Sequence, residues 1–223
     1  MSPSKKMSKH QIKEDKLLTT TFRATEYIQK NPKLFVITGI VVAAVFTIIV
    51  LIKYTINKQQ GNAQDLYIRA NMSLAAGNID AAISDFTSLV NEYEATPYAR
   101  SARLSLANKY FSEQDWDRAL TEFEKLAENS GGDKMMLSIA LAGAASCHEQ
   151  IGDYLQAGKN YLEASNAFES PILSPGQLLK AGLNFIKAGD KTQASEAFKK
   201  IEEKYINSSE ASAARRHLAE VNL

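Results

Sequence analysis

The 223-residue sequence contains a single cysteine and only three histidines. Cys147 alone cannot form an intrachain disulfide, and a small buried hydrophobic role fits it better than intermolecular pairing. His10, His148 and His217 fall in three separate segments, without the spacing of a metal site. Glycine-rich phosphate loops and nucleophile-elbow motifs are also missing. These absences predict a protein that is not an enzyme and that uses no cofactor, metal or small-molecule substrate.

The stretch from Leu34 to Ile52 contains no charged residue, and Lys33 and Lys53 flank it. A helix of this length rises about 28 Å, close to the thickness of the hydrocarbon core of a bilayer. A buried helix of a soluble protein normally interrupts such a run with polar positions. A cleaved signal peptide has a shorter apolar region followed by a small-residue cleavage site, and residues 53–57 contain none. The stretch therefore predicts an uncleaved transmembrane helix with its ends at Leu34 and Ile52.

The charges on the two sides of this stretch differ in sign. Residues 1–33 hold eight Lys and Arg against three acidic side chains, whereas residues 59–223 hold sixteen basic against twenty-two acidic ones, a net charge of −6. Basic residues beside a single span favour a cytoplasmic N-terminus, so residues 63–223 are expected on the translocated side of the membrane. Lys53 and Lys58 weaken the contrast. An acidic outer domain also argues against nucleic acid as a partner.

The segments that flank the predicted span carry weaker signals. Residues 11–29 place apolar side chains among charges, which suits a helix on the inner leaflet, a helix docked on a cytoplasmic partner, or a partly ordered tail. These three alternatives stay open for a basic leader over residues 1–33. Gly61-Asn62 is expected to end the helix that follows the span, with Asn62 capping the next helix. Residues 53–62 are then a short linker.

A repeat begins at residue 63. Four turns recur at intervals of 37, 38 and 37 residues, at Gly77-Asn78, Gln114-Asp115, Gly152-Asp153 and Gly189-Asp190. Seven residues before each turn lies a small residue, and about nine residues after it an aromatic one: Ala70, Ala107, Ala145 and Gly182, then Phe86, Phe123, Tyr161 and Phe198. In such a copy a first helix, helix A, ends at the turn and a second, helix B, begins at the Asp or Asn cap. Small residues let the pair approach closely, and the aromatic fills the gap to the next pair. Since one pair cannot bury its apolar face alone, stacked pairs are expected.

This pattern resembles the tetratricopeptide repeat, whose period is 34 residues. The resemblance implies an all-α protein: one N-terminal transmembrane helix, then an α-solenoid of about four helix pairs over residues 63–223, closed by a capping helix at 209–221. Gln114 departs from the turn glycine and Lys191 from the aromatic position after the turn. Acidic side chains of the B helices are expected to be solvated: Glu122, Glu124, Glu202 and Glu203.

In this repeat class helix A lines the concave wall through slots two, five, nine and twelve, where slot one is residue 63, 100, 138 or 175. Among these slots the candidate peptide groove comprises Tyr67, Asn71, Leu104, Asn108, Phe111, Ser146, Glu149, Leu179, Leu183 and Ile186. Amides at Asn71 and Asn108 occupy equivalent slots and are candidates to hold the backbone of an extended peptide. The alternative is that neighbouring helices only pack against Leu104, Phe111, Leu183 and Ile186. Slots two, five and six mostly lack the Lys and Arg that would grip a terminal carboxylate.

With its basic leader KEDKLLTTTFRATEYIQKNPK, one span and four repeats, the chain also resembles the bacterial YfgM-like inner-membrane proteins. That resemblance implies partners in the translocon and among periplasmic chaperones, and thus an ancillary or adaptor role in protein export. The alternative is a structural or scaffolding subunit of another membrane complex. A less favoured alternative is an organellar import receptor with its repeats in the cytosol.

Overall fold

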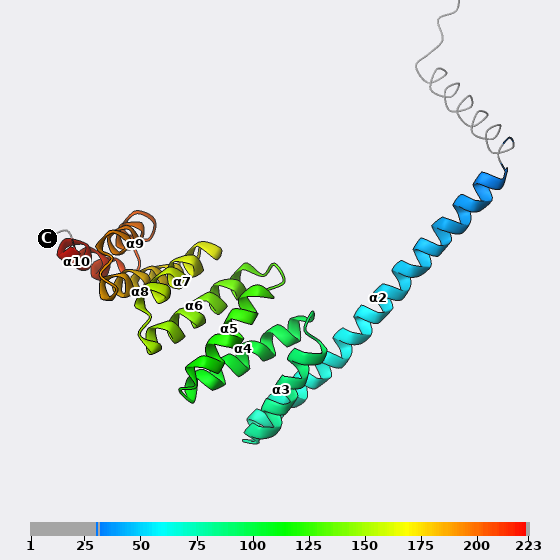
Figure 1. Ribbon diagram of the computed structural model, residues 1–223, viewed down its shortest axis with the longest axis horizontal. Helices are drawn as coiled ribbons and strands as arrows, with labels where there is room; N and C mark the ends of the chain where they lie inside the picture. The colour runs from blue at the N-terminus through cyan, green and yellow to red at the C-terminus, as the bar shows by residue number, and fades with distance from the viewer. Residues whose placement is uncertain (1–29, 31, 222–223) are drawn as a thin grey trace, which may run out of the picture. The chain divides into compact units, whose positions relative to one another are not determined.

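The computed structural model describes residues 30 and 32–221, and within them the regular structure is entirely helical. The predicted all-α class is thereby confirmed. The leader lies outside the described residues, apart from positions 30, 32 and 33. The helices are α2 (Pro32–Ala75), α3 (Ile79–Glu92), α4 (Pro97–Ser112), α5 (Trp116–Glu128), α6 (Lys134–Ile151), α7 (Tyr154–Ala167), α8 (Ser174–Lys187), α9 (Lys191–Lys204) and α10 (Ala211–Val221) (Figure 1). The chain divides into two compact units, residues 1–57 and 58–223.

The first part of α2 is apolar on every side. Its large hydrophobic side chains are exposed, including Val36 at 62% and Phe46 at 66%. A polar side chain within this stretch is satisfied by its own helix, since the Thr47 hydroxyl donates to the Ala43 carbonyl at 2.8 Å. Among the described residues, this is the one helix long and apolar enough to cross a membrane. Exposing an apolar surface of this kind to water is unfavourable.

Gly61-Asn62 does not end a helix. Helix α2 runs through both residues to Ala75, so the expected helix end and the Asn62 cap are wrong, and residues 53–62 belong to this one continuous helix. A glycine inside a helix costs only about 1 kcal/mol relative to alanine. That cost is offset here because the helix must continue to carry Ala63 and Ala70, both fully buried, into the first core.

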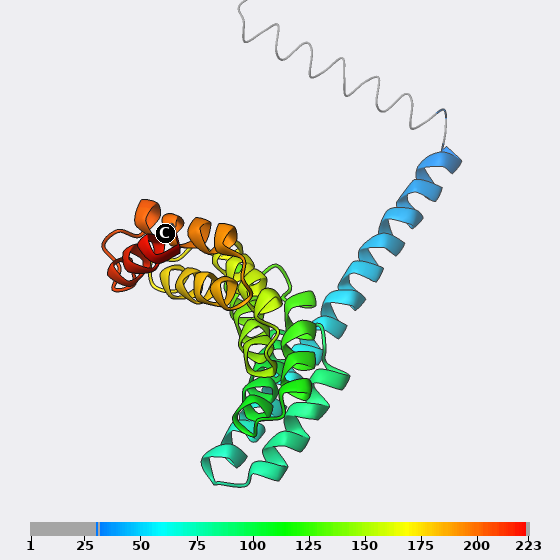
Figure 2. The same cartoon turned by 60° about the vertical axis from the view of Figure 1, so that its left-hand side comes forward.

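The four predicted turns are confirmed. In each, the side chain of the Asn or Asp accepts a hydrogen bond from the backbone nitrogen three residues further on, and so caps the following helix. The caps are Asn78, Asp115, Asp153 and Asp190. Within residues 58–221 this produces helix pairs stacked in chain order, each helix lying beside the next (Figures 1 and 2).

The turn of the second copy is strained. Gln114 adopts a φ of 62°, in the left-handed region that glycine occupies at Gly77, Gly152 and Gly189. A residue with a side chain pays about 1–2 kcal/mol to adopt this conformation. Glycine avoids this cost, but it also makes the unfolded chain more flexible, which offsets part of the gain in stability. We expect Gln114→Gly to raise the free energy of unfolding by about 1 kcal/mol, measured by urea denaturation of the detergent-solubilised chain.

The matched control for this change is Gln150→Gly. Gln150 is also exposed but lies inside α6, where glycine should lower the free energy of unfolding by about 1 kcal/mol. A decrease for both variants would show that the turn of the second copy does not strain Gln114.

Close packing depends on the small residues of helix A. A Cβ added to Gly182 would meet the Phe198 ring at 2.3 Å, and one added to Gly143 would meet the Phe123 ring at the same distance. All four predicted aromatics are buried, in three successive core clusters along the solenoid. Small residue and aromatic ring therefore fit one another, as the repeat pattern predicts.

Helix α10 closes the last cluster. Ala211 and Ala214 are buried against it, whereas Arg215 and Arg216 are exposed, and the Arg215 guanidinium pairs with Glu202 at 2.9 Å. A helix with one apolar and one charged face is what the end of a solenoid requires. The helix begins at Ala211 rather than at the expected residue 209.

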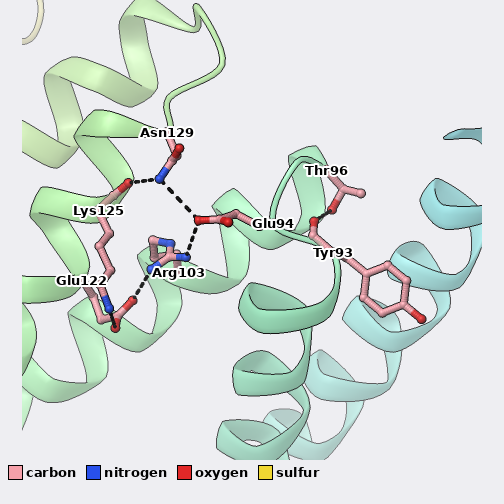
Figure 3. A network of polar contacts seen from close by, with 7 residues as sticks. All are labelled: Tyr93, Glu94, Thr96, Arg103, Glu122, Lys125 and Asn129. Atoms are coloured by element: carbon pink, nitrogen blue, oxygen red, sulfur yellow. Dashed lines mark hydrogen bonds and ion pairs between the residues drawn. The ribbon is translucent and has the colours of Figure 1, made fainter.

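One acidic side chain of the B helices is not solvated as expected. Glu122 is 16% exposed and pairs at 2.9 Å with Arg103, whose side chain is 7% exposed (Figure 3). Arg103 also reaches Glu94 at 3.5 Å, and the Asn129 amide donates to the same Glu94 oxygen at 3.4 Å. The network joins the α3–α4 loop to α4 and α5. The expectation failed for Glu122 because Arg103 occupies a core position of helix A and needs a buried counter-charge.

Candidate functional site

A hollow of about 380 Å³ opens between α6, α7 and α8, which are yellow-green to orange in Figure 2. It lies in the third and fourth copies, and its lining comes from the A helices of both, from one aromatic of α7 and from the loop that precedes α8. The lining residues are Ile139, Ala142, Gly143, Ser146, Tyr161, Ile172, Leu173, Gly176, Gln177 and Lys180.

Side chains with little or no bulk make room for the hollow. Ala142 and Gly143 of α6 face it, and α6 can lie tight against α5 because Gly143 leaves space for the Phe123 ring. On the other wall, a Cβ added to Gly176 of α8 would meet nothing within 4 Å. The space between the two A helices therefore stays open because the residues that line it there are alanine and glycine, which have little or no side chain.

A chain of hydrogen bonds runs along one wall. The hydroxyls of Ser146 and Tyr161 are 2.8 Å apart, and the Tyr161 hydroxyl donates to Glu149 at 3.5 Å. Lys187 donates to the other oxygen of Glu149 at 2.9 Å. Burial raises the pKa of Tyr161 to about 12, so its hydroxyl stays protonated. Burial opposes the charge of Glu149, but hydrogen bonds from Lys187 and Asn184 outweigh it and hold the pKa of Glu149 below its usual value.

The fourth copy contributes two longer polar side chains. Gln177 is 9% exposed, and its amide donates to the Ser138 hydroxyl at 2.9 Å, which ties α8 to α6. Lys180 is exposed, with its ammonium 5.3 Å from the centroid of the Tyr161 ring. Among the lining residues, Lys180 is the one that carries a full charge.

The predicted groove residues of the first two copies lie in mixed surroundings. Tyr67 is half-buried, with its ring 6.0 Å from Phe86 and 5.8 Å from Tyr98. Asn71 is exposed, and its amide donates to the Tyr67 carbonyl at 2.7 Å, so this donor already serves its own helix. Asn108 is exposed, whereas Leu104 and Phe111 are half-buried beside the second-copy core.

The predicted residues of the last two copies divide in the same way. Ser146 lines the hollow and Glu149 is hydrogen-bonded beside it. Leu179 and Leu183 are half-buried against the C-terminal core, and Ile186 is 37% exposed. The apolar slots thus serve partly as core, and their role in binding stays a prediction.

Sequence reasoning missed several residues of the hollow: Tyr161, Ile172, Leu173, Gln177 and Lys180. Lys180 had a signal, because it occupies slot six of the fourth copy. Tyr161 was assigned to the core as a helix B aromatic, which is right for its ring but leaves out its hydroxyl. Ile172 and Leu173 lie in an inter-repeat loop, where no periodicity indicates which side chains face a hollow.

Cys147, His148 and His217 do not line this hollow. Cys147 is fully buried, and burial raises the pKa of its thiol to about 11, with a smaller contribution from Glu124. It packs as the small hydrophobic residue that its isolation in the sequence predicts. Across residues 30 and 32–221, no group of three His, Cys, Asp or Glu side chains is placed to hold a metal ion.

Solved structures of other repeat proteins share this fold. A tetratricopeptide repeat protein from Parabacteroides merdae matches 72% of the chain over 60% of its own length, with a TM-score of 0.57 and 18% identity. BtubC from P. vanneervenii matches 70% of the chain over 64% of its length, with a TM-score of 0.53 and 14% identity. The MamA protein matches 72% of the chain over 91% of its length, with a TM-score of 0.51 and 15% identity. This chain thus spans less than two thirds of the first two proteins.

Comparison at the level of sequence families is more specific. No curated protein matches the chain significantly. The family model of the tetratricopeptide repeat matches residues 178–208, which include most of the fourth helix pair. The tetratricopeptide repeat-like domain matches residues 25–169, more than half of the chain. The protein therefore belongs to the tetratricopeptide repeat-like domain family.

Proposed function

We propose that this protein is a membrane-anchored protein-interaction module whose A helices bind an extended segment of a partner protein. The hollow between α6, α7 and α8 carries the proposal, because it combines apolar walls with a few placed polar groups, as peptide and ligand sites do. Stacked repeats generally use such surfaces for protein binding. The apolar part of α2 would hold the module at a bilayer.

The finer proposal concerns place and pathway. The repeats would lie on the periplasmic side of a bacterial inner membrane, serving as an ancillary subunit or adaptor for protein export and chaperone handling. The charge asymmetry between residues 1–33 and 59–223 supports this topology, and the resemblance to YfgM-like proteins supports the pathway. Protease added to spheroplasts should then digest the repeats; their protection would contradict this topology.

Site-specific photo-crosslinking in cells tests the binding surface. A photoreactive amino acid would replace Asn108 or Lys180 on the A-helix surface, and Glu163, an exposed residue of α7, would be the control position. We expect capture of translocating chains from the first two positions, rising when export is jammed. Equal capture from position 163, or capture unaffected by jamming, would contradict the proposal.

A scaffolding role in another membrane complex is the second candidate. The outer face of the last turns of α2 exposes two large apolar side chains, Ile68 at 48% and Met72 at 67%. A stable subunit would bury this face against a neighbour. Purification in mild detergent followed by mass spectrometry should then recover a partner that the Ile68→Ser and Met72→Ser double variant loses, while groove variants retain it.

A further inference from the structure

We propose that the hollow between α6, α7 and α8 selects a segment with a large apolar side chain beside an acidic one. The apolar side chain would enter the hollow, and the side-chain carboxylate would pair with Lys180. This inference rests on the proposed function and names the class of segment that the same surface binds. It also commits to an internal acidic residue of a partner rather than to a chain terminus.

The walls determine the apolar part of the recognition. Ile139, Ala142 and Leu173 present hydrocarbon, and Ile172 at the rim is 86% exposed. A volume of about 380 Å³ has room for one large apolar side chain, which would displace several of the waters there. Replacing these waters by one large apolar side chain removes hydrocarbon surface of both partners from water.

The rim determines the charge. Lys180 is the charged lining residue, whereas the nearby carboxylate of Glu149 is already neutralised by Lys187 at 2.9 Å. The hollow therefore presents a local positive charge on a domain whose residues 59–223 have a net charge of −6. An acidic side chain is attracted here, and a basic one is attracted to the rest of the domain instead.

The polar wall holds the backbone between these two groups. The Ser146 hydroxyl lies 3.0 Å from the Ala142 carbonyl, to which it donates, and 2.8 Å from the Tyr161 hydroxyl. With Ser146 donating to Ala142, Tyr161 is the donor in the second bond, and its single proton is shared between Ser146 at 2.8 Å and Glu149 at 3.5 Å. Each oxygen then keeps a lone pair for an N–H of the bound segment. A terminal carboxylate would need several donors or cations in place of this single lysine.

Gly176 permits a block of the hollow that spares the fold. A side chain at this position starts in open space, and replacing a helical glycine removes a conformational cost. Gly176→Leu should therefore obstruct the hollow from the α8 side, while Gly176→Ala, the matched control, adds one methyl group and leaves most of it open. Thermal unfolding followed by circular dichroism should show both variants at least as stable as the parent chain.

The binding test uses the full chain in mild detergent and fluorescein-labelled decapeptides with blocked ends. The peptides are alternating glycine and serine with a central leucine and, two residues further on, aspartate, serine or lysine. By fluorescence anisotropy we expect the aspartate peptide to bind about fivefold tighter than the lysine peptide, and leucine-to-serine replacement to abolish binding. Lys180→Glu should reverse the charge preference, and Gly176→Leu should abolish binding of every peptide.

The outcomes separate the two proposals. If Gly176→Leu abolishes binding but the flanking charge and Lys180→Glu have no effect, the proposed function stands and this inference fails. If Gly176→Leu leaves all peptide binding and all cellular crosslinks unchanged, the proposed function fails at this surface. Tighter binding of a peptide with a free C-terminal carboxylate, or a dimer that Gly176→Leu dissociates, would also overturn the inference.

Discussion

Replacing Glu122 by alanine is expected to lower the free energy of unfolding by about 3 kcal/mol. Glu122 is the close partner of Arg103, at 2.9 Å, and the Arg103 side chain is 93% buried. Without Glu122 the guanidinium keeps only Glu94, which lies 3.5 Å away and is 59% exposed (Figure 3). A buried charge that loses its main partner retains its desolvation cost without the compensating attraction. The loss should appear as a lower midpoint in urea denaturation.

The double variant Arg103→Met with Glu122→Leu is the decisive control. It removes both charges and keeps the volume apolar, and such replacements of buried ion pairs are often neutral or stabilising. We expect most of the lost stability to return. If the double variant is as unstable as Glu122→Ala, the pair itself holds α4 and α5 together, and the account in terms of an uncompensated charge is wrong.

Replacing Phe198 by alanine is expected to cost about 4 kcal/mol, because the ring is fully buried and fills the space beside Gly182. The ring also stacks on His217 of α10, with the centroids 5.5 Å apart. Since repeats contact mainly their neighbours, the damage should be local. Hydrogen exchange should accelerate in α9 and α10 well before it accelerates in α4 and α5.

Ile172→Ala is the matched control for size. The side chain is 86% exposed, so its truncation should change the free energy of unfolding by less than about 0.5 kcal/mol. Exchange that accelerates equally in all helices of the Phe198→Ala variant would mean that the solenoid unfolds as one cooperative unit. That result would contradict the local picture.

Much of the fold can be predicted from the sequence because the same local pattern of residues occurs in all four copies of the repeat. An Asp or Asn cap, a small residue on helix A and an aromatic on helix B predict the helix pairs, and all four caps and all four aromatics are found where expected. The apolar run ending at Ile52 likewise predicts a helix by composition alone. Gly61-Asn62 shows the limit of local signals. Tertiary packing of Ala63 and Ala70 keeps α2 helical through a pair of residues that favour a helix end.

The candidate site is less predictable, because slots on helix A do not say which side chains are covered. Periodicity placed Ser146 and Glu149 on helix A, where Ser146 lines the hollow, but the open space at Gly176 depends on how three helices and one loop surround it. Arg103 makes the same point in the core. The repeat period places it on helix A of the second copy, whereas its burial and its pairing with Glu122 became visible only in the packed structure.

The sequence by itself thus determined the all-helical class, the apolar helix, the repeat and its turns, since all of these depend on residues close together in the chain. Only the tertiary structure decided that Leu34–Ile52 belongs to a helix extending to Ala75, that Glu122 is half-buried beside Arg103, and that a hollow with Lys180 at its rim opens between the third and fourth copies. These features depend on side chains from different helices competing for the same space. The spacing of residues along the sequence does not predict which of these side chains are buried and which stay exposed.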